Sequence, residues 1–153
     1  MRRVVITGVG AVSPVGNTAE ETWNSLIAGK CGIGPITHFD TSDPACKVKV
    51  AAEVKEFDPS LYMEKGEIRK TDLYAQYAMA AAVQAMKDSD LDGHIDPERL
   101  GVYVGSGIGG MTTFVEECNK LENSGMKRIS PFFIPMMISN IAAGNIAIRF
   151  KAE

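Results

Sequence analysis

The sequence contains few cysteines, and none of them is spaced like a metal, redox or disulfide site. Cys31, Cys46 and Cys118 are odd in number, lie far apart and form no CxxC pair. With only two histidines, His38 and His94, they define no zinc site, and they are too sparse for a disulfide framework. We therefore predict a reducing, cytoplasmic location, no metal site and ordinary cysteines rather than a nucleophile.

The sequence also lacks a strong charge of one sign and a clean apolar run. Its 16 Lys and Arg against 19 Asp and Glu give a net charge of −3, which offers no general attraction for nucleic acid. The uncharged stretch 129–148 contains Pro135 and Asn140, whose backbone or side chain would need polar partners in lipid. We expect no nucleic acid and no membrane as partners.

The patterns that are present are typical of one α/β domain. The chain has 153 residues, of which 45% are hydrophobic and 23% charged, ordinary values for a folded protein. Apolar β-branched runs and alternation predict strands, while caps and helical periodicity predict helices between them. The predicted strands are 3–9, 47–55 and 100–104, and the predicted helices start at Thr18 and span 72–88, 111–123 and 136–150. This order favours a largely parallel sheet with functional loops at its strand ends.

A glycine turn follows the strand predicted at 100–104. Gly105, Gly107 and Gly110 fit the GxGxxG spacing between a strand and a helix, which is the context of a dinucleotide site. That site also needs an acidic residue about 20 positions later, where this chain has Lys127 and Arg128. A tight backbone turn is therefore favoured over nucleotide binding, which stays the weaker alternative.

Two further groups of residues allow both a functional and a structural interpretation. Basic side chains could form a surface for an acidic partner, although Glu64 and Glu67 lie among them and favour a self-compensated surface. Ile108 and the run 132–134 could line an apolar pocket or simply belong to the core. The basic residues concerned are Lys65, Arg69, Lys70, Lys127 and Arg128.

Three segments taken together resemble a known family. They are residues 3–16 (RVVITGVGAVSPVG), 101–110 (GVYVGSGIGG) and 129–135 (ISPFFIP). Their set and order are similar to those of condensing enzymes of the β-ketoacyl-[acyl carrier protein] synthase II (FabF-like) family, and the resemblance spans essentially the whole chain. It implies a thiolase-like fold, in which two related α/β halves form a protomer and protomers form a homodimer. Residues 1–153 would be the N-terminal half, incomplete and truncated before the nucleophile.

The resemblance also implies an activity. In the family, an acyl chain is transferred to a cysteine, and a decarboxylative Claisen condensation with malonyl-[acyl carrier protein] gives 3-oxoacyl-[acyl carrier protein] during fatty-acid elongation. The expected nucleophile, histidines and lysine would follow residue 153, so we expect no catalytic residue and no cofactor in this chain, and no activity of the fragment alone. The alternative is a non-catalytic chain-length or scaffold partner subunit of a ketosynthase.

Individual roles follow only at the positions that match the family. Gly107 and Ile108 would face the acyl pocket, and Phe133 would complete its wall across the dimer interface. The five basic residues Lys65, Arg69, Lys70, Lys127 and Arg128 would contact the acidic acyl carrier protein. The implied partners are thus the carrier protein, acyl and malonyl thioesters and a second protomer.

Overall fold

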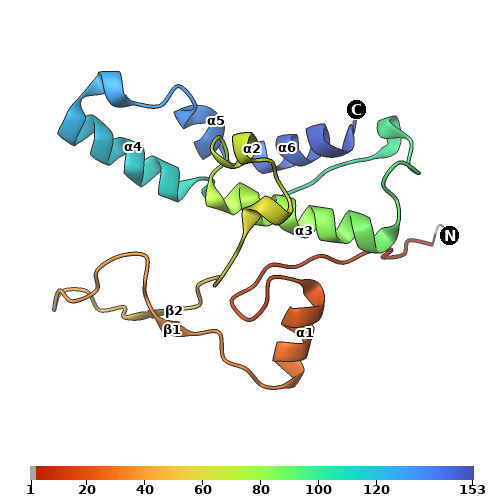
Figure 1. Cartoon of the computed structure of the whole chain (residues 1–153), viewed down its shortest axis with the longest axis horizontal. Coiled ribbons are helices and arrows are strands. Elements are labelled where there is room, and N and C mark those ends of the chain that lie inside the picture. The colour runs from red at the N-terminus through yellow and green to blue at the C-terminus, as the bar shows by residue number, and fades with distance from the viewer. Residues whose placement is uncertain (1–2) are drawn as a thin grey trace.

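The computed structural model describes residues 3–153 and is organised around one long central helix, α3 (Figure 1). The C-terminal helix α6 packs along α3, and α4 and α5 extend the helical layer to one side. The N-terminal segment, α1 and a small strand pair lie on the other side of α3 (Figure 1). The helices are α1 (Ala19–Ile27), α2 (Lys65–Ile68), α3 (Leu73–Ser89), α4 (Met111–Ser124), α5 (Phe133–Met137) and α6 (Ile141–Phe150), with 3-10 turns η1 (Pro59–Leu61), η2 (Pro97–Arg99) and η3 (Met126–Arg128).

Helix α3 forms where the sequence predicts it. Asp72 caps its first turn by accepting a hydrogen bond from the Tyr74 amide, and Asp90 ends it in the left-handed conformation, with φ of 53°. Its buried positions include Ala75 and Ala80, whose small side chains let neighbouring segments approach the helix closely. The predicted helix at 72–88 is confirmed.

The N-terminal segment runs along α3 and is held by side chains of that helix. The Val9 amide donates to Asp88 Oδ2 at 2.9 Å, and the Ala11 amide donates to Gln84 Oε1 at 3.2 Å. A β-carbon at Gly10 would overlap the carbonyl oxygen of Ala81, so only glycine permits this approach. The glycines near the start of the chain therefore serve packing of backbone against helix.

The strands predicted at 3–9 and 100–104 do not form within the described residues. Val4, Ile6 and Tyr103 are 92%, 88% and 97% exposed, and these segments have no strand neighbour among residues 3–153. An extended segment becomes a strand only when a second segment completes its hydrogen-bond ladder. The β-structure that does form is a short antiparallel pair, β1 (Gly34–Pro35) with β2 (Val50–Ala51). The strand or hairpin arm predicted at 47–55 is thus confirmed only at Val50–Ala51.

The other helix predictions are confirmed in part. Thr18 caps α1, as predicted, by accepting a hydrogen bond from the Glu21 amide at 3.1 Å, and α4 closely matches the prediction for 111–123. The helix predicted at 136–150 is divided instead, because Ile138 adopts an extended backbone with ψ of 138° and separates α5 from α6. None of the helices within residues 3–153 has both the length and the apolar character needed to cross a membrane.

Replacing Gly10 with alanine tests the close approach to α3. We expect Gly10→Ala to lower the free energy of unfolding by about 1–3 kcal/mol, because the added methyl group meets backbone that has little room to move. Gly144→Ala in α6 is the matched control, since a β-carbon there meets nothing within 4 Å and should stabilise the helix by about 0.5–1 kcal/mol. Urea unfolding measures both, and equal effects of the two substitutions would contradict this packing.

Candidate functional site

The glycine turn at 105–110 is fixed between the start of α3 and the end of α5. The Gly110 amide donates to the carbonyl oxygen of Met137 at 2.8 Å, and Gly109 has a φ of 88°, which favours glycine. A β-carbon at Gly110 would lie 2.6 Å from the Met136 carbonyl oxygen and 2.8 Å from Asp72 Oδ2. The turn therefore tolerates no side chain at its last position.

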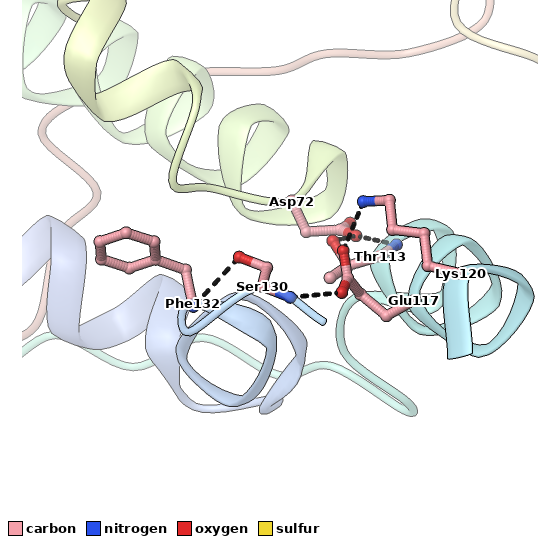
Figure 2. A network of polar contacts seen from close by, with 6 residues as sticks. All are labelled: Asp72, Thr113, Glu117, Lys120, Ser130 and Phe132. Carbon is pink, nitrogen blue, oxygen red and sulfur yellow. Dashed lines mark hydrogen bonds and ion pairs between the residues drawn. The ribbon is translucent and has the colours of Figure 1, made fainter. Parts of the chain in front are cut away.

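Asp72, at the start of α3, binds Thr113 in the first turn of α4 (Figure 2). Its side chain caps α3 through Oδ1, while Oδ2 accepts hydrogen bonds from the Thr113 amide at 2.8 Å and from the Thr113 hydroxyl at 2.6 Å. Helix α4 begins after Gly110, which has no side chain to cap it, so Asp72 supplies the missing acceptor from another helix. Asp72 is 4% exposed, and the positive ends of both helix dipoles favour its negative charge.

Glu117 makes a second link one turn further along α4 (Figure 2). This residue is 3% exposed, and its carboxylate accepts hydrogen bonds from Lys120 Nζ at 2.6 Å and from the Ser130 amide at 2.7 Å. The Lys120 hydrogen bond, supported by the Ser130 amide, lowers the pKa of Glu117 below its ordinary value of 4.5. The hydrogen bond to Glu117 in turn raises the pKa of Lys120. Glu117 thereby holds α4 against the connection that leads into α5.

The residues predicted to line an acyl pocket lie beside these two links. Ile108 is 69% exposed, and a β-carbon at Gly107 would meet nothing within 4 Å. Phe133, the first residue of α5, is half-buried, with its ring centroid 6.3 Å from that of Phe114 on α4. The turn thus presents Ile108 and Gly107 at an open surface, while Phe133 packs against α4.

The five predicted basic residues are all exposed but fall into two groups. Lys65, Arg69 and Lys70 belong to α2 and the residues after it, beside α5 in Figure 1, whereas Lys127 and Arg128 form η3 beyond the outer end of α4. Within residues 3–153, the ion pairs are His38 with Glu53 and Lys120 with Glu117, so none of the five cations is paired with a carboxylate.

Lys70 and the neighbouring glutamates are arranged in a way that the sequence does not reveal. The Lys70 ammonium group lies 5.1 Å from the centroid of the Phe132 ring, a cation–π geometry. Glu67 accepts a hydrogen bond from the Glu64 amide at 2.8 Å and completes a capping box at the start of α2. Glu64 and Glu67 therefore cap their own helix rather than pairing with the lysines.

The hydrogen bonds of the glycine turn do not suit a dinucleotide site. The amides of Gly110 and Thr113, which a dinucleotide site would offer to a pyrophosphate, donate instead to Met137 and Asp72. A carboxylate thus fills the anion position at the start of α4, which argues against nucleotide binding. Among residues 3–153, no group of three or more His, Cys, Asp or Glu side chains is placed to hold a metal ion.

Comparison with known proteins places the chain in a family. The family model described as "Beta-ketoacyl synthase, N-terminal domain" matches residues 1–153. The chain is 48% identical over 153 residues to a 3-oxoacyl-[acyl-carrier-protein] synthase 2 of Coxiella burnetii, and 41% identical over 153 residues to one of Synechocystis, covering 99% of this chain and 36% of each relative. The chain therefore belongs to the β-ketoacyl synthase family and corresponds to its N-terminal domain.

Solved structures agree with this assignment. One comes from a complex of a type II polyketide synthase acyl-carrier protein with its ketosynthase. Its TM-score is 0.80 and its identity 28%, and the match covers 100% of this chain and 41% of that chain. The ishigamide ketosynthase/chain length factor also has a TM-score of 0.80 and an identity of 28%, and the match covers 98% of this chain and 37% of that chain. These neighbours confirm the thiolase-like fold. The chain spans about a third of the length of the curated relatives that it matches.

Acid should weaken the link made by Glu117. Since its pKa is lowered in the folded protein, the stability it contributes is present above about pH 4.5 and is lost as the pH falls through the folded pKa. We expect the melting temperature of Glu117→Gln to be lower than that of the wild type at pH 7, and the difference to shrink below pH 4.5. Glu116→Gln, at an exposed neighbouring position, is the control; a difference independent of pH would contradict the assignment.

Proposed function

We propose that this chain works as the N-terminal part of a condensing enzyme of fatty-acid elongation. The observation that supports this most directly is the match of the family model to residues 1–153. Identities of 48% and 41% to proteins named 3-oxoacyl-[acyl-carrier-protein] synthase 2 point to the same class of reaction. The complete enzyme joins an acyl thioester to malonyl-[acyl carrier protein] and forms 3-oxoacyl-[acyl carrier protein].

The reaction divides into two steps. The acyl group first passes from the carrier thioester to a cysteine thiolate, which forms a new thioester and releases the carrier thiol. Malonyl carrier protein then loses CO2, and the resulting carbanion attacks the acyl thioester, forming a carbon–carbon bond as the cysteine leaves. The groups that break bonds lie in the remaining part of the enzyme, and we assign no such role to residues 3–153.

The role of this chain is to build the acyl pocket. Gly107 and Ile108 would face the acyl chain, and Phe133 would complete the wall across the interface of a homodimer. The positions of these residues are compatible with that role, because Ile108 stands exposed on a turn held by buried hydrogen bonds. Phe133 begins α5, directly after the connection that Glu117 anchors. The homodimer would act in the cytoplasm.

The second role is docking of the acyl carrier protein on the five basic residues. Their exposure and the lack of carboxylate partners among the described residues leave their positive charge available to an acidic protein. A structural neighbour is a ketosynthase in complex with its acyl-carrier protein, which supports a carrier as the partner. The separation into two groups suits a partner that touches α2 and η3 together.

Covalent labelling tests the activity. The complete polypeptide that carries this chain should accept a radiolabelled acyl group from acyl carrier protein, because acylation of the enzyme precedes condensation. Label that stays with the protein through denaturing electrophoresis, and is released by hydroxylamine, is the expected result.

An unlabelled but folded protein would instead support the alternative, a non-catalytic chain-length or scaffold subunit. One neighbour, the ishigamide ketosynthase/chain length factor, gives this alternative its basis. Its identity to this chain is 28%, against 48% for the synthase of Coxiella burnetii, which favours the enzyme.

Charge reversal tests carrier docking. Lys65→Glu and Lys127→Glu, made separately, should each weaken binding of the acidic carrier protein several-fold, because each removes attraction and adds repulsion. The loss of affinity should be larger at low salt, where charges are screened less. Lys47→Glu, at an exposed position outside both groups, is the control. Surface plasmon resonance at two salt concentrations measures the effect; three equal affinities would exclude these groups as the docking surface.

A further inference from the structure

The geometry points to Asp72 as a positioning residue that sets the acyl pocket wall and thereby the chain-length preference of the enzyme. This inference rests on the proposed function and adds to it a residue that does not itself touch the acyl chain. Asp72 is buried, with 4% of its surface exposed, and is hydrogen-bonded through both carboxylate oxygens. It has no access to substrate and acts only through what it holds.

Asp72 lies against the last residue of the glycine turn. Gly110 lies so close to Asp72 Oδ2 that a β-carbon there would be 2.8 Å from this oxygen. On its other side, the Gly110 amide is bonded to the Met137 carbonyl at 2.8 Å. The backbone at the end of the turn is thus held between α3 and α5, and Ile108, two residues earlier, takes its position from this contact.

Thr113 binds Asp72 through two donors. The Thr113 hydroxyl donates to Asp72 Oδ2 at 2.6 Å, and the Thr113 amide donates to the same oxygen at 2.8 Å. Hydrogen bonds to a buried carboxylate are stronger than those between neutral groups. The removal of one donor leaves the buried charge with too few hydrogen bonds. The carboxylate of Asp72 would then move closer to its remaining amide donors, and the turn that packs against it would move as well.

Helix α4 also holds the connection that leads to Phe133. Helix α4 carries Thr113 and, one turn later, Glu117, which binds the Ser130 amide at 2.7 Å and so fixes the connection before Phe133 (Figure 2). Ile108 is therefore positioned through Asp72 at the start of α4, whereas Glu117 positions Phe133, the wall that this chain would offer to the pocket of a second protomer. A change at the Asp72 contact moves Ile108 relative to the wall that the second protomer contributes, and this changes the space open to the acyl chain.

The test removes the hydroxyl group of Thr113 and keeps the shape of the side chain. Thr113→Val deletes the 2.6 Å hydrogen bond to Asp72, and Thr113→Ser keeps it. Thr112→Val makes the same chemical change one residue away, at an exposed position. In the complete enzyme, the rates of acylation from a long-chain and a short-chain acyl carrier protein are measured for each variant, with the melting temperature and the KM for the carrier.

We expect Thr113→Val to change the ratio of the two acylation rates by roughly tenfold, since a displacement of about 1 Å can cost on the order of 100-fold in rate. The KM for the carrier should stay constant, because docking uses other residues. Thr113→Ser should restore the wild-type ratio, and Thr112→Val should leave it unchanged. A purely structural role would lower the melting temperature and both rates alike, with no change in their ratio, and that result would overturn the inference.

Asp72→Asn provides a second route if Thr113→Val does not fold. It keeps the shape of the side chain but replaces one acceptor oxygen with a donor, so its rate ratio should change in the same direction. Failure of wild-type acylation would overturn the proposed function, whereas normal acylation with an unchanged ratio in a folded Asp72→Asn variant would overturn this inference alone.

Discussion

The close approach of other segments to α3 is the constraint on which the rest of the structure depends. Alanines at buried and half-buried positions of this helix leave its backbone accessible, and Gly8 and Gly10 lack the β-carbons that would clash with it. The N-terminal segment can therefore lie along α3, and α6 can pack along the same helix, with Ile146 in one buried cluster with Met79 of α3. Close packing of this kind gains many small dispersion contacts and leaves little freedom for adjustment.

The candidate site is attached to this rigid centre mainly through main-chain amides. Asp72 and Glu117 are both buried, and each accepts a hydrogen bond from a backbone amide of a segment distant in sequence. An amide in a helix or tight turn has a fixed direction, so such a contact defines position more narrowly than a pair of long side chains does. Buried carboxylates thus act here as connectors between elements, and the surface residues inherit their placement from them.

Local features of the fold could be predicted from the sequence, whereas contacts between distant segments could not. Thr18 and Asp72 mark helix starts in the sequence, because a capping side chain binds a backbone amide only two or three residues later. The helix break lies at Ile138, which is neither glycine nor proline, so the apolar periodicity predicts one continuous helix where the structure has α5 and α6. Residues 3–9 have strand composition, but a ladder depends on a neighbour that composition does not identify.

The site shows the same division between local and distant information. The glycine turn was visible in the sequence, because its spacing is local. The link of Asp72 to Thr113 spans 41 positions, and nothing in either residue type marks the partner. Ile108 and Phe133 are recognisable as pocket residues only through the family resemblance, since an apolar residue in a pocket wall looks like any other core residue in the sequence. A threonine in the first turn of a helix whose cap is glycine is the signal that could have drawn attention to α4.

The exposed extended segments have a consequence for the order of events during folding. Helices such as α3 and α4 form from contacts within a few residues and do so in microseconds or less. Residues 3–9 and 100–104 have no ladder partner within residues 3–153, and pairing with any distant segment would be slower than helix formation. Val4, Ile6 and Tyr103 are therefore open to solvent when the helices have formed. Exposed apolar side chains on extended segments invite pairing with other chains, so these two segments are where aggregation of the folded helical layer would begin.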